Sequence, residues 1–256
     1  MALPIDPHND GSADYAVRHV LSVLGKAQVQ GDVEIPAGKH VDAVDCTGRL
    51  SIRANASVHS ARANQIFLQA GAHAVELASA HAAIMVEPEV QFHWLDAPTI
   101  RFVANSHDAL TGTPPQMPFV QPGDRGQPTK FIRIEGNWQP PVDSPIEGDY
   151  VVTGDVVLLP AVQVLGHIKA YGNVDLGVDS CVHGSVFSEG GVTLWPKARV
   201  LGVVSAGRDV QLHAGSIVGC SDQLCSVSAP CIVAHVGACV HGSIQAYKSG
   251  LSISGG

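Results

Sequence analysis

Val164-Leu-Gly166-His-Ile168-Lys-Ala170-Tyr-Gly172-Asn-Val174-Asp-Leu176 is one of three tandem copies of a pattern that begins again at Val182 and at Val200. The even-numbered positions of the copies are apolar or small, apart from Arg208, and most odd-numbered positions are polar. Alternation of this kind is typical of β-strands with one buried face. The fixed interval of 18 residues predicts a solenoid, in which each unit buries its apolar face by stacking on its neighbours. Because 18 residues divide into three faces of six, we expect a triangular β-helix.

The same phase extends on both sides of these copies, from Ile146 to Val218. Steps of six residues through this range meet one polar residue, Ser188. Glycine stands two residues after many of these positions, where it would give room and backbone freedom at the bends between faces; these are Gly148, Gly154, Gly166, Gly172, Gly184, Gly190 and Gly202. A phase kept over this length assigns residues 146–218 to the β-helix.

The composition narrows the classes of protein. The 256 residues suffice for one or two domains and are poor in aromatic and charged side chains. A net charge of -8 without a basic run argues against a nucleic-acid-binding surface, and no apolar run reaches the roughly 20 residues that span a bilayer. The first ten residues lack the pattern of a secretory signal, and the six cysteines contain no CxxC pair. We therefore expect free thiols in a reducing cytoplasm, with membrane association peripheral to the inner membrane at most.

The N-terminal part of the chain divides into two regions. Residues 1–26 are expected to form a tail and a short helix, which begins at Ser12 or Asp14 and plugs one end of the solenoid rather than binding a membrane. Residues 27–104 repeat a looser pattern that predicts an irregular β-helix-like region, although the alanine-rich residues 78–83 also suit a helix. The expected strand cores of this region are 33–35, 50–52, 66–68, 84–86 and 100–102.

Eight prolines interrupt the pattern over residues 105–145. This segment is either a linker between two β-helical lobes or a long loop from one continuous solenoid, and within it Phe131–Ile134 alternates as a further strand would. Residues 146–256 form the more regular β-helix. Its phase slips after Val218, because the next copy begins at Val240, so that extra residues must bulge out within 219–235.

The bulge contains Cys220, Cys225, Cys231 and His235. Thiolate and imidazole groups are the usual ligands of zinc. The spacing of these residues is not that of a zinc knuckle or ribbon, so we expect small buried cysteines and no metal site.

The tandem V-x-G-x-[IV]-x-[AS]-x-G-x-V-x-L units, clearest over residues 164–218, resemble the core domain of bactofilins, the polymer-forming cytoskeletal proteins of bacteria. The resemblance covers about residues 150–247. It implies a right-handed triangular β-helix that polymerises end to end, without nucleotide, into cytoplasmic and often membrane-associated filaments. The chain departs from the family in its upstream β-rich region and proline-rich insert, because bactofilins usually have one short β-helix with disordered tails.

Two other classes compete with this interpretation. Hexapeptide-repeat acyltransferases are trimeric, left-handed β-helices with 18-residue coils and a catalytic histidine between subunits. Their apolar residue is followed directly by a small one, whereas Leu201, His183 and Trp195 occupy that place here. No histidine of the repeats has an adjacent carboxylate or nucleophile that would make it a base; these are His167, His183, His213, His235 and His241. His183 and His241 occupy equivalent positions of the hexad, and we expect both to face outward. A β-helical adhesin or virion protein is the third class, for which the sequence carries no export signal.

These features together predict a structural protein without catalytic residues or cofactors, which self-associates and scaffolds other components such as a cell-envelope protein. The expected mechanism is edge matching, in which an uncapped terminal coil offers unpaired backbone groups and an apolar cross-section to another copy. If the N-terminal helix caps one end, the last coil alone remains free and a dimer is favoured over a filament. The residues assigned to this contact are Val240, Ile244, Ala246, Tyr247 and Leu251.

Overall fold

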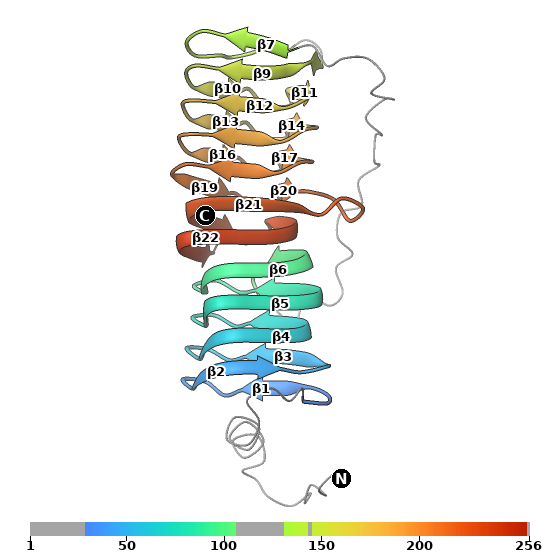
Figure 1. Cartoon of the computed structure of the whole chain (residues 1–256), viewed down its shortest axis with the longest axis vertical. Coiled ribbons are helices and arrows are strands. Elements are labelled where there is room, and N and C mark those ends of the chain that lie inside the picture. The colour runs from blue at the N-terminus through green and yellow to red at the C-terminus, as the bar shows by residue number, and fades with distance from the viewer. Residues whose placement is uncertain (1–28, 106–130, 143–144, 255–256) are drawn as a thin grey trace, which may run out of the picture.

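The computed structural model describes residues 29–105, 131–142 and 145–254, which contain 22 β-strands and no helix. The strands wind into one rod of stacked coils (Figure 1). The predicted β-helix is confirmed as a β-solenoid of about 11 coils with a repeat of about 18 residues. The expected tail and helix of residues 1–26 lie outside the described residues.

The first half of the rod contains the long strands of the chain's N-terminal part. All its neighbouring strands pair in parallel. The alanine-rich residues 78–83 belong to one of these strands and not to a helix, and each expected strand core lies within a strand. The strands are β1 (Val33–Ile35), β2 (His40–Asp45), β3 (Arg49–Ile52), β4 (Ser57–Leu68), β5 (His73–Val86) and β6 (Gln91–Phe102).

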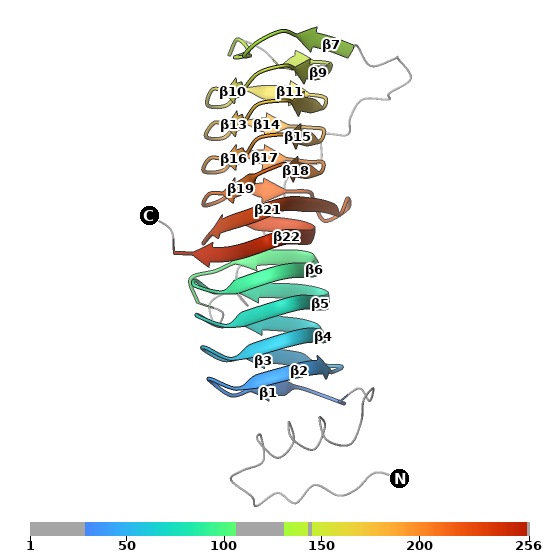
Figure 2. The same cartoon turned by 60° about the vertical axis from the view of Figure 1, so that its left-hand side comes forward.

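The second half begins at the opposite end of the rod and winds back toward the first (Figures 1 and 2). Its first strand is the expected Phe131–Ile134, so this half starts before residue 146. Its strands are β7 (Phe131–Ile134), β8 (Ile146–Glu147), β9 (Asp149–Val152), β10 (Val156–Leu158), β11 (Gln163–Leu165), β12 (Ile168–Ala170), β13 (Val174–Leu176), β14 (Cys181–Val182), β15 (Val186–Ser188), β16 (Val192–Leu194), β17 (Arg199–Val200), β18 (Val204–Ala206), β19 (Asp209–Leu212), β20 (Ile217–Val218), β21 (Cys225–His235) and β22 (Cys239–Ile253).

Like residues stack on one another along the inside of each face. In one row, Val156 pairs with Val174, Val174 pairs with Val192, and Val192 pairs with Val210. All four valines are fully buried. Because burial of such a side chain contributes roughly 1.5–3 kcal/mol, each coil is stabilised mainly by the coils above and below it.

Close approach of successive coils explains the glycines of the hexads. A Cβ on Gly202 would lie 2.7 Å from the carbonyl oxygen of Gly184, and a Cβ on Gly184 would lie 2.6 Å from the carbonyl carbon of Gly166. Neither Gly184 nor Gly202 has a positive φ. The lack of space for a side chain, and not backbone freedom, therefore requires glycine at these two positions.

Polar side chains at one corner of the second half link its coils by hydrogen bonds. The backbone N–H of Asp155 donates to Oδ1 of Asn137 at 2.9 Å, and that of Asn173 donates to Oδ1 of Asp155 at 2.7 Å. The N–H of Gly191 then donates to Oδ1 of Asn173 at 3.0 Å. Each side chain thus satisfies a backbone donor that the bend between two faces leaves without a strand partner.

The change of the repeat interval after Val218 is caused by a turn between β20, which ends at Val218, and β21, which begins at Cys225. Cys220 and Gln223 form an isolated antiparallel bridge within it. The strands regain their pairing afterwards, because Val227 lies beside Val204 and Ile232 lies beside Val210. The extra residues are thereby confined to a projection from the side of the rod, as the sequence predicts.

Candidate self-association site

The two halves of the rod meet at a seam formed by β6 and β22 (Figure 2). Each strand belongs to the last coil of its own half. They pair in antiparallel orientation, whereas the other ladders between named strands are parallel. The chain therefore advances along the rod in opposite directions in the two halves, and the change occurs at the seam. Residues 103–130 connect the seam to the far end of the second half.

Apolar side chains from both halves face each other inside the seam. Val240 pairs with Ile100, and Ile244 pairs with Leu95. All four are fully buried. The seam therefore continues the hydrophobic interior from one half into the other without interruption.

The remaining residues assigned to self-association lie in the same strand. Ala246 is buried, whereas Tyr247 is 65% exposed and Leu251 lies at the surface. The edge that the sequence predicts to be free is consequently paired within the chain. The expectation of a free last coil was wrong because nothing in the alternation of β6 marks it as an antiparallel partner.

An aromatic ring of the first half packs against a glycine of the second. Phe92 is 1% exposed and also contacts Phe102, with the ring centroids 6.0 Å apart. A Cβ on Gly250 would overlap ring atoms of Phe92 and lie 2.6 Å from its carbonyl oxygen. Glycine at this position thus permits β22 to approach β6.

Hydrogen bonds satisfy polar groups at the seam. The hydroxyl of Ser252 donates to the carbonyl oxygen of Glu87 at 2.6 Å and accepts the N–H of Val90 at 2.9 Å. The Nδ1 atom of His93 lies 3.1 Å from the carbonyl oxygen of Ala246. Such contacts prevent the penalty of roughly 1–3 kcal/mol for an unsatisfied buried polar group.

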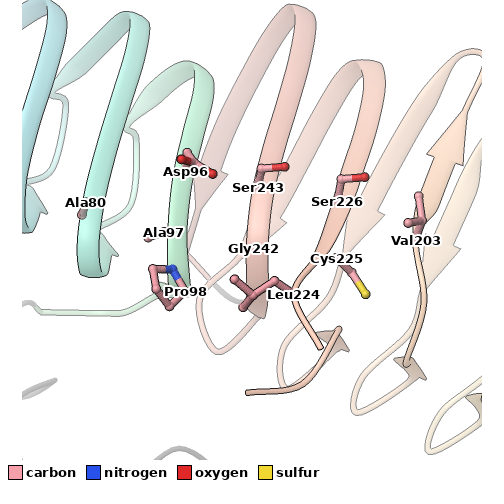
Figure 3. A pocket seen from close by; sticks show the side chains of 10 residues that line it. All are labelled: Ala80, Asp96, Ala97, Pro98, Val203, Leu224, Cys225, Ser226, Gly242 and Ser243. Atoms are coloured by element: carbon pink, nitrogen blue, oxygen red, sulfur yellow. The ribbon is translucent and has the colours of Figure 1, made fainter. Parts of the chain in front are cut away.

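A shallow pocket of about 420 Å³ lies where the seam reaches the surface (Figure 3). Asp96 of β6, Ser243 of β22 and Ser226 of β21 form a row along one side, and Leu224 lies at the lower edge. The thiol of Cys225 donates to the carbonyl oxygen of Leu201 at 3.3 Å, and burial raises its pKa. This thiol is held neutral and is a poor nucleophile, so the row offers hydrogen-bonding groups to a ligand but no activated group.

Three ring systems stack at one position of successive coils, a feature that the sequence reasoning missed. The centroids of Trp195 and His213 are 4.7 Å apart, and those of His213 and His235 are 4.4 Å apart. Burial lowers the pKa of His213, and the neighbouring His235 lowers it further. The three residues follow one another at intervals of one coil, if the extra residues of the bulge are subtracted. This interval is the sequence signal that would have predicted the stack.

The other histidines of the repeats also make structural contacts. The Nδ1 atom of His167 accepts the N–H of Ser185 at 2.8 Å. His241 was expected to face outward but is buried in the seam, where its Nδ1 lies 3.4 Å from Oγ1 of Thr99. Burial lowers the pKa of both His183 and His241. The neutral state of His183 and of His241 is therefore favoured.

All six cysteines are free thiols. Burial raises the pKa of Cys181 and that of Cys239 to about 11. Within the described part of the chain, no three or more histidine, cysteine, aspartate or glutamate side chains are grouped as a metal site would require, and this includes Cys220, Cys225 and Cys231.

The coil that begins with β7 forms the far end of the second half. Phe131 is 70% exposed, and the inward-facing Ile132 and Ile134 are half-buried. Their partners one coil inward, Tyr150 and Val152, are buried. Among residues 29–105, 131–142 and 145–254, β9 is the one strand that pairs with β7. No described residue therefore pairs with the outer backbone edge of this coil or covers its apolar cross-section.

No helix among the described residues is long and apolar enough to cross a membrane. Comparison of the chain with family models, with curated proteins and with solved structures finds no match.

Proposed function

We propose that the protein is a structural, self-associating scaffold of the bactofilin type, whose copies join through the β7 end of the rod without nucleotide. A protein of this kind acts in the cytoplasm, holds another component such as a cell-envelope protein, and has no catalytic residues. The observation that carries the proposal is the partial exposure of Ile132 and Ile134, at a strand edge with which no described residue pairs. Exposed edges of this kind are templates for pairing with another chain.

The seam shows which chemistry joins two ends of this solenoid. At the seam, antiparallel backbone pairing accompanies the burial of facing aliphatic side chains such as Ile244 and Leu95. The β7 end offers the same two components, namely a backbone edge that no other described strand pairs with and the half-buried aliphatic pair Ile132 and Ile134. An isologous contact of two β7 ends, related by a twofold axis, would reproduce the antiparallel orientation.

Charge also restricts the register of such a contact. In a pairing centred on Arg133, two guanidinium groups would lie opposite each other, which is destabilising. Centring on Ile132 instead places Phe131 of one copy opposite Arg133 of the other. A cation over an aromatic face contributes about 0.5–1 kcal/mol at exposed sites, so the second register is favoured.

Substitution of Phe131 and Ile132 by glutamate tests the proposal. We expect the wild-type protein to form concentration-dependent dimers or larger assemblies in light scattering and negative-stain microscopy. Phe131→Glu and Ile132→Glu should each reduce the assembly by placing a carboxylate in the contact. Phe187→Glu is the matched control, because Phe187 is similarly aromatic and exposed but lies on the side of the rod.

A wild-type protein that stays monomeric at all concentrations would refute self-association. Assembly that survives in both folded β7 variants would place the contact elsewhere. A tight trimer would instead favour the acyltransferase class, and binding of acyl-coenzyme A would then be the next measurement.

A further inference from the structure

The seam joins two half-solenoids that are otherwise independent in their pairing. Within the described residues, every ladder of β1 to β5 stays in the first half, and every ladder of β7 to β21 stays in the second. The seam ladder of β6 with β22 is the exception. Each half therefore presents a completed edge to the other, and that edge does not depend on which chain supplies its partner.

The seam surfaces are complementary to each other and not to themselves. The glycine at position 250 makes room for the ring and carbonyl group of Phe92. Ser252 of β22 likewise requires the backbone groups of Glu87 and Val90. A pair of β22 edges would lack Phe92, whose ring fills the space at Gly250. The partner that fits β22 is thus β6.

The connection between the halves is long enough to reach a neighbouring molecule. Residues 103–130 extend at most about 90 Å, at about 3.3 Å per residue. From β22 to β7 the second half advances through β21, β18, β15, β12 and β9. With the further step from β22 to β6, where the connection begins, and at about 4.8 Å per coil, this distance is about 34 Å. The reach exceeds the span about threefold, so the tether allows β6 to leave its own second half.

We propose that two copies of this protein exchange halves at the seam, with β6 of each chain seated on β22 of the other. The exchange conserves every seam contact. Its cost is the loss of the effective concentration that arises because both halves belong to one chain, which is on the order of millimolar for linked modules. The exchanged pair consists of two composite rods held side by side by the two connections. This inference is independent of the β7 contact, and it supplies a lateral link between rods where the proposed function supplies an end-to-end link.

Cysteines placed on opposite sides of the seam distinguish exchange from pairing within one chain. Trp94 and Gln245 are ladder partners with outward-facing side chains. Paired residues of an antiparallel ladder lie about 4.5–5.5 Å apart at Cα, which is within the range of a disulfide. One full-length chain carries Trp94→Cys and a first affinity tag, and another carries Gln245→Cys and a second tag. The two are unfolded and refolded together at about 5 μM or about 500 μM and then mildly oxidised, and chains with both tags are quantified on non-reducing gels.

Exchange predicts a disulfide between the two tagged chains that increases at least about tenfold between the two concentrations. The matched control replaces Gln245→Cys by Phe187→Cys, which lies on the same face several coils from the seam. The double variant Trp94→Cys/Gln245→Cys reports whether the seam forms within one chain. If it closes its disulfide within one chain while the cross-chain product stays no greater than the control, the proposal is overturned. Failure of the double variant to close any disulfide would also overturn it, because the seam itself would then be absent. Neither readout depends on residues of β7.

Discussion

Replacing Gly250 by alanine tests the packing on which the seam depends. The new Cβ would overlap ring atoms of Phe92 and lie 2.6 Å from the Phe92 carbonyl oxygen. The ring is fully enclosed and rests on Phe102, so it has little room to turn away. Overpacking of this kind costs about 1–3 kcal/mol. We expect the free energy of unfolding to fall by about that amount.

Phe92→Ala completes a double-mutant cycle with Gly250→Ala. Alone, it removes a buried ring and should cost about 3–5 kcal/mol. In the Phe92→Ala background, the Cβ of the alanine at position 250 no longer meets an aromatic ring, but it still meets the backbone carbonyl oxygen of residue 92. The cost of Gly250→Ala should therefore shrink without vanishing, which corresponds to a coupling energy of about 1 kcal/mol or more.

Urea unfolding followed by circular dichroism measures these free energies. Because the seam is the pairing that couples the two halves, the weakened variants should also begin to unfold in two steps rather than one. Leu251→Ala serves as the control, since Leu251 neighbours Gly250 but lies at the surface and should change the stability by about 0.5 kcal/mol or less. Wild-type stability of Gly250→Ala, or strict additivity with Phe92→Ala, would show that Phe92 does not pack on Gly250.

Three further outcomes follow from the buried and hydrogen-bonded groups. Burial lowers the pKa of His213 below its ordinary value of 6.5, so the stability that the neutral imidazole contributes is complete above pH 6.5 and is lost as the pH falls. The midpoint of urea unfolding should therefore drop between pH 7.5 and pH 5.5. The drop should be smaller in His213→Asn. Cys181 and Cys239, with thiol pKa values near 11, should resist iodoacetamide at pH 8 until urea unfolds the chain, as mass spectrometry of the labelled protein would show. Asp155→Ala removes the acceptor of a backbone N–H and should cost about 1–3 kcal/mol in urea unfolding, whereas an equal loss in the outward-facing Asp175→Ala would contradict the role of the corner hydrogen bonds.

The coils themselves are predictable from the sequence because their pairing is local. A residue such as Val174 meets Val156 and Val192, one coil before and after it, so the repeat of the sequence is also the repeat of the contacts. The strand cores of the first half follow for the same reason, even where Ala78 and Ala80 also suited a helix. The bulge after Val218 is visible as a change of interval.

The seam is not predictable in this way. Its residues are separated by more than a hundred positions, and the inward-facing Ile244 looks the same whether its neighbour is a parallel coil or an antiparallel one. The decisive features are single residues, such as Gly250 opposite Phe92, that form no repeat. The same limit explains why the alternation alone predicts the last coil to be the free edge and does not mark the exposed Phe131 as a contact residue.

The long sequence separation across the seam has a consequence for synthesis of the chain. The first half is complete once Phe102 has left the ribosome, yet β22, which covers it, ends at Ile253. At about 5–20 residues per second, the edge of β6 stays uncovered for roughly 8–30 s. During that time neighbouring nascent chains on one messenger expose the same uncovered strand to one another. Slower translation through the second half is therefore expected to increase aggregation at this edge.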